Sequence, residues 1–264
     1  MNTITTVDRL RRRLGLSTTT EDVQLREALE AATRQMERLA GRRFTPRQAV
    51  IAHDVLPQEP SHLLLRDDLL ALTSLTDAGG AIPLNEALVL PGGDCLGAVI
   101  ELVGGRTFRW TQTPRQAISV GGVWGWHDRP SQMWRGSGDT VRSNPFSSSA
   151  TTLNVTDASA ADSEGEAPRF QVGQLLKIED EYLRVLAVSI VAGADDVLTL
   201  QRGVNGTTAA AHAQGVAIAV YQPPADVEQL ALAWAGWLYR QPDFAPSEPT
   251  PPDLLRMLAP LRRV

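Results

Sequence analysis

The spacing of apolar residues predicts helices at both ends of the chain. Val7, Leu10 and Leu14 fall on one face of a first helix, which Gly15 ends, with Thr5 as the expected cap. A second helix follows a Thr18/Glu21 capping pattern and ends at Gly41. Its apolar positions recur every three or four residues: Leu25, Ala28, Leu29, Ala32, Met36 and Leu39. Helical spacing returns after Pro224, so we expect a third helix from Asp226 to Arg240 and a last short one from Leu254 to Leu258.

Between these helices the pattern is that of β-strands. From Ala49 to Trp126 the chain consists of short apolar or alternating runs, punctuated by Gly and Pro, such as "AVIAHDVL", "EALVLPGG" and "GAVIELVGG". A second group of short, evenly spaced runs lies between about Thr152 and Gln222, as in a small barrel or sandwich. The intervening stretch from His127 is rich in Ser, Gly and Pro, and we predict that it is an extended loop or linker.

This order of elements predicts an α+β fold in which an outer domain is discontinuous. Residues 1–144 would supply its N-terminal helices and first β part, and residues 223–264 its C-terminal helix and tail. Residues 145–222, which we call the β-module, would form a small all-β domain, a barrel or a sandwich, inserted between them.

Composition narrows the class of protein. The chain has 264 residues, 43% of them hydrophobic, which is enough to build a buried core. Its net charge of −5 argues against a general nucleic-acid-binding surface. A single cysteine excludes an intrachain disulfide and a thiolate metal cluster within one chain. Because the N-terminus has no hydrophobic signal region and no apolar run approaches eighteen residues, we expect a protein of the cytoplasm with no membrane partner.

The stretch "LQRGVNGTTAAAHAQG", Leu200 to Gly215, resembles a phosphate-binding loop only in its glycines. A phosphate loop lies between a strand and a helix and has a lysine, whereas this stretch has no lysine and leads into the strand-like "VAIAVY". Asn205-Gly206 suits the positive φ angles of a turn. We therefore interpret the stretch as a connection between strands, with His212 as a polar loop histidine bonded to backbone.

Two further features suggest chemistry or binding. Glu179 and Glu181 in "KIEDEYLRV" would share one face of a strand and could flank a glycosidic bond, but an acidic turn between two strands gives the same letters. The tryptophans of "GVWGWHDRPSQMW" could stack on sugars or anchor a subunit interface. Neither completes a catalytic set, so we expect no catalytic residue, cofactor or metal, and no enzyme.

The C-terminal tail offers a binding element. Prolines in "PSEPTPPD" prevent continuation of the preceding helix. Leu254, Leu255, Leu258 and Leu261 then lie within eight residues, a stripe too short to be stable alone in water. Such a helix either binds a groove on a partner or folds back on its own domain.

Several segments resemble the head–tail connector, or head-completion adaptor, family of tailed bacteriophages. These are the paired helices with the Gly41-Arg42-Arg43-Phe44 step, the "GGVWGWH" segment and the helix "PADVEQLALAWAGWLYR". The β-module is similar to a small β-domain that recurs in phage virion proteins, in which the Arg-Gly-X-X-Gly-Thr stretch is a structural turn. Compact family members lack this insertion, so the resemblance assigns it no role.

The resemblance implies a structural virion protein of the head–tail neck, assembled in the host cytoplasm. Family members form a ring, dodecameric in the family, that binds the phage portal protein, extends the DNA channel without specific DNA binding, and docks the tail, stopper or tail-completion protein. Their C-termini commonly reach into the portal, which assigns portal binding to Leu254, Leu255, Leu258, Leu261, Arg262 and Arg263. The alternative, suggested by the acidic strand and the tryptophans, is a virion-associated tail module that binds or hydrolyses host glycan.

Overall fold

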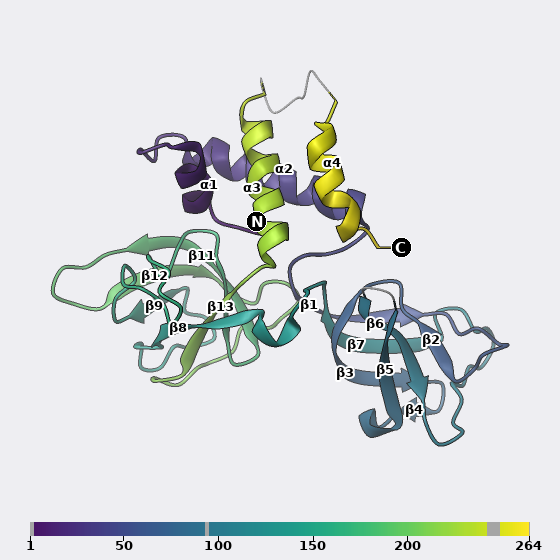
Figure 1. The fold of residues 1–264 in the computed structure, drawn as a ribbon. Helices are drawn as coiled ribbons and strands as arrows, with labels where there is room; N and C mark the ends of the chain where they lie inside the picture. Colours follow the sequence, from purple (N-terminus) through teal and green to yellow (C-terminus); the bar gives the residue numbers. More distant parts are fainter. Residues whose placement is uncertain (1–2, 93–94, 242–248, 264) are drawn as a thin grey trace. The chain divides into compact units, whose positions relative to one another are not determined.

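The computed structural model describes residues 3–92, 95–241 and 249–263 (Figure 1). The chain forms two compact units, and both are discontinuous in sequence. Unit 1 consists of Met1–Met36 and Asp128–Pro260, and unit 2 of Glu37–His127 and Leu261–Val264. The chain contains both helices and sheets, so the expected α+β class is confirmed.

The helices lie close to where the sequence predicts them. They are α1 (Val7–Leu14), α2 (Asp22–Ala40), α3 (Ala225–Tyr239) and α4 (Pro252–Leu258), with short 3₁₀ turns η1 (Leu84–Glu86), η2 (Pro130–Gln132) and η4 (Ala259–Leu261). The cap of α1 differs from expectation, because the Thr6 side chain accepts from the Arg9 backbone N–H at 3.3 Å and Thr5 instead bonds to Glu228. Gly15 and Gly41 both have positive φ and end their helices as predicted.

Helix α3 is the centre of the helical part of unit 1. It is apolar around most of its circumference, and a helix of that kind is stable only when neighbours cover it on several sides. Both α1 and α4 pack against it, and the Trp234 indole N–H donates to Gln35 of α2 at 2.9 Å. Its buried residues include Val227, Leu230, Ala231, Leu232, Trp234, Ala235 and Leu238.

The sheet of unit 1 has six strands in the order β8-β13-β10-β11-β12-β9, with antiparallel neighbours throughout. The strands are β8 (Trp134–Thr140), β9 (Thr152–Val155), β10 (Leu175–Ile178), β11 (Glu181–Ser189), β12 (Asp196–Gln201) and β13 (Ala217–Tyr221). Phe146, Phe170, Leu183, Leu198 and Val220 are among the residues of its continuous buried core. The Leu200–Gly215 stretch thus joins two strands that are not neighbours in the sheet.

Strand β8 corrects the expectation of a linker after His127. Its inward positions are Arg135, Ser137 and Asp139, all buried and all polar, so the strand carries no apolar alternation. Instead, Arg135 lies 2.8 Å from Asp162, and Asp139 accepts hydrogen bonds from the backbone of Thr156 and Asp157. Apolar alternation could not predict β8, because buried polar pairs replace the usual apolar residues of a strand.

The division of the chain also differs from the predicted boundaries 1–144, 145–222 and 223–264. Helices α1, α3, α4 and most of α2 group with the β-module in unit 1, whereas the last turn of α2, from Glu37, belongs to unit 2 with the first β part. Contacts of the N-terminal segment account for this, since Thr6 donates to Gln171 at 2.6 Å and Arg9 pairs with Glu166 at 3.4 Å. Arg184 of the β-module, almost fully buried, donates to the Thr3 carbonyl at 3.5 Å.

Unit 2 contains the first β part as two sheets. One sheet has the order β1-β7-β3-β4 and the other β2-β6-β5. Their strands are β1 (Arg47–His53), β2 (His62–Leu64), β3 (Leu69–Asp77), β4 (Gly80–Ala81), β5 (Ala87–Gly92), β6 (Cys95–Leu102) and β7 (Ile118–Trp124). Leu63, Ile100, Phe108, Ile118 and Trp124 belong to one buried cluster, so this unit has its own core.

Candidate functional site

The residues expected to bind a portal lie in α4, η4 and the segment that follows. Leu254, Leu258 and Leu261 are buried by the chain itself, Leu255 and Arg263 are half-buried, and Arg262 is exposed. In the single chain the tail therefore folds back, which is one of the two arrangements that the sequence allows, and portal binding by these residues stays a prediction. For Leu254 and Leu258 the physical reason is the apolar surface of α3, against which α4 packs, because each buried leucine contributes about 1.5–3 kcal/mol. The preceding residues 242–248 lie outside the described part of the chain.

Arg263 is held within unit 2. Its backbone N–H donates to the Ala40 carbonyl at 2.8 Å, which satisfies one of the free carbonyls at the end of α2. Its guanidinium donates to the Leu65 carbonyl at 2.6 Å. Of the two arginines expected to pair with acidic partner residues, Arg262 is thus the exposed one.

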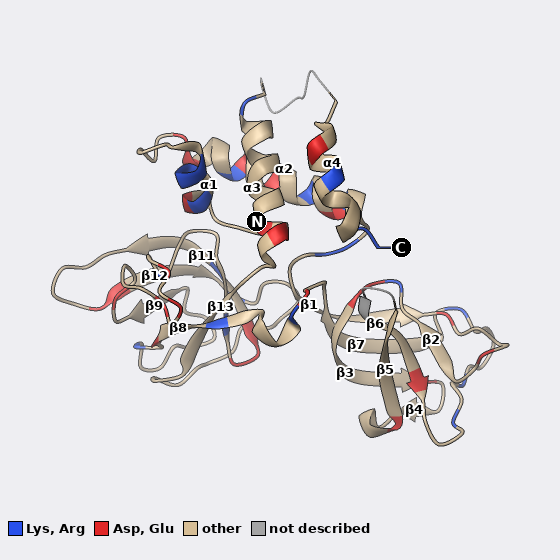
Figure 2. Cartoon of the chain, viewed as in Figure 1, with Lys and Arg blue, Asp and Glu red and all other residues tan. Residues whose placement is uncertain are grey.

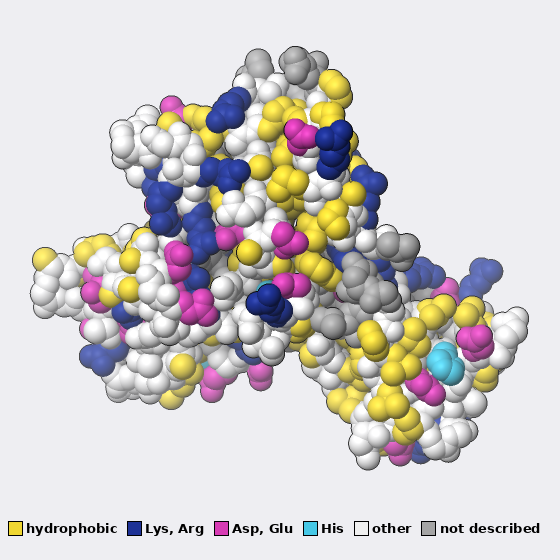
Figure 3. Space-filling view, in the orientation of Figure 1, with side chains coloured by type: hydrophobic (Ala, Val, Ile, Leu, Met, Phe, Trp, Pro, Cys, Tyr) yellow, Lys and Arg dark blue, Asp and Glu magenta, His cyan; other side chains and the backbone are white. Residues whose placement is uncertain are grey.

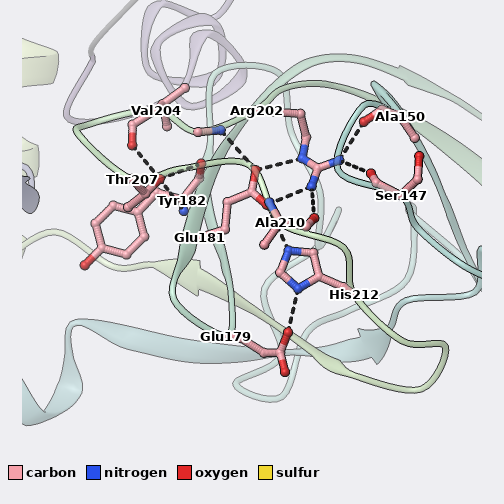
Figure 4. A network of polar contacts seen from close by, with 11 residues as sticks. Ser147, Ala150, Glu179, Glu181, Tyr182, Arg202, Val204, Thr207, Ala210 and His212 are labelled. Atoms are coloured by element: carbon pink, nitrogen blue, oxygen red, sulfur yellow. Dashed lines mark hydrogen bonds and ion pairs between the residues drawn. The ribbon is translucent and has the colours of Figure 1, made fainter.

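The Leu200–Gly215 stretch is bound along its length to the hairpin of β10 and β11 (Figure 4). Arg202 forms hydrogen bonds to Glu181 from Nε and from Nη2, each 2.7 Å long, and also donates to the carbonyls of Ser147 and Ala150. Thr207 Oγ1 accepts from the Tyr182 N–H at 3.0 Å. Asn205 and Gly206 have φ angles of 52° and 84°, as the turn interpretation predicts. This stretch is a fixed structural connection.

Glu181 is the most strongly bound carboxylate of this network. Its side chain is fully buried, and burial alone would raise its pKa. The hydrogen bonds from Arg202, from the Ala210 N–H, from His212 and from the Gly203 N–H outweigh burial and lower the pKa of Glu181 to about 2. An ionised carboxylate with these partners has no proton to give to a leaving group.

His212 lies between Glu179 and Glu181, the two carboxylates that could flank a glycosidic bond if they shared a strand face. Its Nδ1 is 2.6 Å from Glu179 and its Nε2 is 2.9 Å from Glu181 (Figure 4). The expectation that this side chain bonds to backbone is wrong, because the carboxylates come within reach only when the sheet is formed. Glu179 has φ of 50° and lies in the turn between β10 and β11, as the alternative of an acidic turn predicts. The two glutamates are thus joined through the His212 imidazole and do not line an open cleft.

The tryptophan-rich segment is also internal. Trp124 is fully buried, Trp126 is 9% exposed and Trp134 is half-buried against Tyr182 and Tyr221. Trp124 stacks on His53 at 5.6 Å between ring centroids and donates to the Ala49 carbonyl. Trp126 packs edge-on against Phe44 of the Gly-Arg-Arg-Phe step. These rings therefore stabilise the fold, and none of the three forms a freely accessible platform for a sugar.

In the part of the chain that the structure describes, no three His, Cys, Asp or Glu side chains are arranged to hold a metal ion. No described helix is long and apolar enough to cross a membrane. Comparison of the sequence with models of protein families and with curated proteins finds no match.

Proposed function

We propose that the chain is a structural virion protein, a head–tail adaptor that forms a ring below the phage portal and docks the tail or stopper. The observation that carries this proposal is the packing of the N-terminal helix pair with the helix that follows residue 224. These are the segments on which the resemblance to the connector family rests. Gln35 bonds to Trp234, Arg13 to Gln229 and Arg9 to Glu228, across about two hundred residues of sequence.

The charge distribution supports passage of DNA without capture. Figure 2 shows basic residues concentrated on α1. Most of them are paired, since Arg9 contacts Glu228, and Arg11 contacts Asp8 and Asp22. Arginines that are already paired with carboxylates bind few DNA phosphates and so release few counterions. The net charge of −5 also disfavours tight binding of duplex DNA.

The polar network of the β-module supports a structural role for that part of the chain. Its buried carboxylate, Glu181, is bound by Arg202, His212 and the Ala210 N–H. A rigid module of this kind enlarges the subunit surface without adding chemistry. We propose that it contributes area for subunit or tail contacts.

Portal docking by the C-terminal residues requires that α4 leave α3. Helix α4 has only seven residues, and Leu254 and Leu258 are its buried leucines. The free energy lost on release, about 3–6 kcal/mol for two leucines, is recovered if the same side chains enter a portal groove. In this proposal α4 is stored on its own subunit and is exchanged onto the portal.

The test uses the portal protein of the same phage. The purified chain is mixed with portal rings and imaged by cryo-electron microscopy. An added layer with the portal's axis is the expected result. Unmodified portal rings beside free chain would reject the adaptor function.

A further inference from the structure

Unit 2 exposes an apolar face on its three-stranded sheet. The register places Leu88, Glu101 and His62 side by side, and Leu90, Val99 and Leu64 in the next row of the same face. Leu64 is 53% exposed and Leu88 49% exposed, whereas Leu63 and Ile100 on the opposite face are fully buried. We call Leu64, Leu88, Leu90 and Val99 the apolar sheet face. The space-filling view shows apolar side chains gathered over this region (Figure 3).

Unit 1 has a hollow of matching chemistry. A groove of about 530 Å³ lies between the α1–α2 region and strand β11. Its apolar lining includes Val7, Val23, Phe170, Val172, Val188 and Ile190, and we call it the apolar groove. Val23 is 51% exposed and Ile190 62% exposed, so the groove offers apolar surface to a partner.

Each surface carries one charge that is poorly paired. Arg26 lines the groove, and its guanidinium has no ion-pair or hydrogen-bond partner among the described residues. Glu101 lies beside Leu88 on the sheet face, and one of its carboxylate oxygens is 3.9 Å from Nε2 of His62. Opposite charges at the edges of two apolar surfaces favour one pairing and one register.

We propose that the apolar sheet face of one copy of this chain docks in the apolar groove of a second copy, with Glu101 next to Arg26. The two surfaces differ, one being a strand face and the other a hollow, so the contact is heterologous. After one contact has formed, the pair of subunits still has one free groove and one free sheet face. A repeated heterologous contact closes into a ring when its rotation allows. The inference rests on the proposed ring and names the surfaces that build it.

The decisive experiment mixes two variants that each lack one surface. Ile190→Asp blocks the groove and leaves the sheet face, and Leu88→Asp does the reverse. Native mass spectrometry should find wild-type oligomers, each variant alone as monomer, and the equimolar mixture as one-to-one dimers that grow no further. Leu56→Asp and Met257→Asp, which change exposed apolar residues outside both surfaces, should leave the oligomers intact. If circular dichroism shows that an aspartate variant is unfolded, Ile190→Ser and Leu88→Ser replace the pair.

A charge exchange tests the register. Arg26→Glu and Glu101→Arg should each weaken assembly at least tenfold, and the double variant should recover most of the loss. Sedimentation velocity over a concentration series measures both effects. Failure of the double variant to recover would reject the Glu101–Arg26 register.

Other outcomes overturn the inference. A wild-type chain that stays monomeric, single variants that still oligomerise, or a mixture that remains monomeric or regains full-size rings would each exclude this contact. The proposed adaptor function and the proposed subunit interface can be rejected independently of each other. Oligomers that form through these surfaces but do not bind the portal would reject the adaptor function alone. Portal-bound rings of the Ile190→Asp variant would reject this interface alone.

Discussion

Arg202 and Glu181 form a buried, two-pronged ion pair, with Nε and Nη2 of the guanidinium each 2.7 Å from a carboxylate oxygen. Their side chains are 7% and 0% exposed. The pair fastens the Leu200–Gly215 connection to the start of β11, so two segments twenty-one residues apart are fixed to each other. Removing one partner leaves the other charged group buried without compensation.

Glu181→Gln should therefore lower the free energy of unfolding of the chain by about 3–5 kcal/mol, since that is the usual cost of breaking a buried pair. Glu179→Gln is the matched control, because the Glu179 side chain is 58% exposed and its substitution should cost less than about 1 kcal/mol. Urea denaturation of both variants measures the difference, and equal losses would contradict the assignment.

His53 should make unit 2 sensitive to acid. Burial lowers the pKa of His53, and neither ring nitrogen has a hydrogen-bond partner among the described residues. The unfolded chain thus binds a proton more readily than the folded one, so stability is full at neutral pH and declines as pH falls through about 6.5. His53→Phe keeps the stacking on Trp124 and should flatten this decline, whereas replacement of the half-buried His62 by Gln should not. Thermal unfolding between pH 7 and pH 5 measures both.

Leu258 should be a stability residue of unit 1. Its side chain is fully buried, so Leu258→Ala should cost about 2–5 kcal/mol. Met257, its neighbour on the same helix, is 45% exposed, and Met257→Ala should change the free energy of unfolding by less than about 0.5 kcal/mol. Hydrogen exchange gives an independent measure, since loss of α4 packing should accelerate exchange in α3. Unchanged protection in α3 would show that α4 does not cover it.

The β-module should fold alone only when β8 is included. Strand β8 pairs with β13 from Trp134 to Thr140, and Val141 donates to the Val216 carbonyl at 2.9 Å. A fragment of residues 128–222 should unfold cooperatively in urea. The shorter fragment 145–222, which follows the boundaries predicted from the sequence, leaves one edge of β13 unpaired and should unfold earlier or without cooperativity. Identical midpoints for the two fragments would contradict the role of β8.

Local apolar spacing was enough to predict α1, α2, α3 and most strands, because these elements bury an apolar face. It could not reveal β8, whose buried positions are Arg135, Ser137 and Asp139 and whose partners are distant in sequence. The environment of His212 was hidden for the same reason, since Glu179 and Glu181 reach it only across the folded sheet.

The C-terminal tail shows a different limit. The sequence predicted its helix and its leucine stripe correctly, but a short apolar helix serves equally well inside its own domain and on a partner. Helix α4 packs inside its own subunit because α3 is apolar around most of its circumference, and this contact exists only in the tertiary structure. The spacing of Leu254 and Leu258 therefore identified an apolar surface and not its partner.

The measurement that tests the central claim most directly is native mass spectrometry of the chain alone and with portal rings of the same phage. The account predicts a closed oligomer of this chain and, on mixing, a complex whose added mass is a whole-number multiple of 28.6 kDa equal to one complete ring. Portal rings that gain no mass, beside a chain that remains at 28.6 kDa, would contradict it.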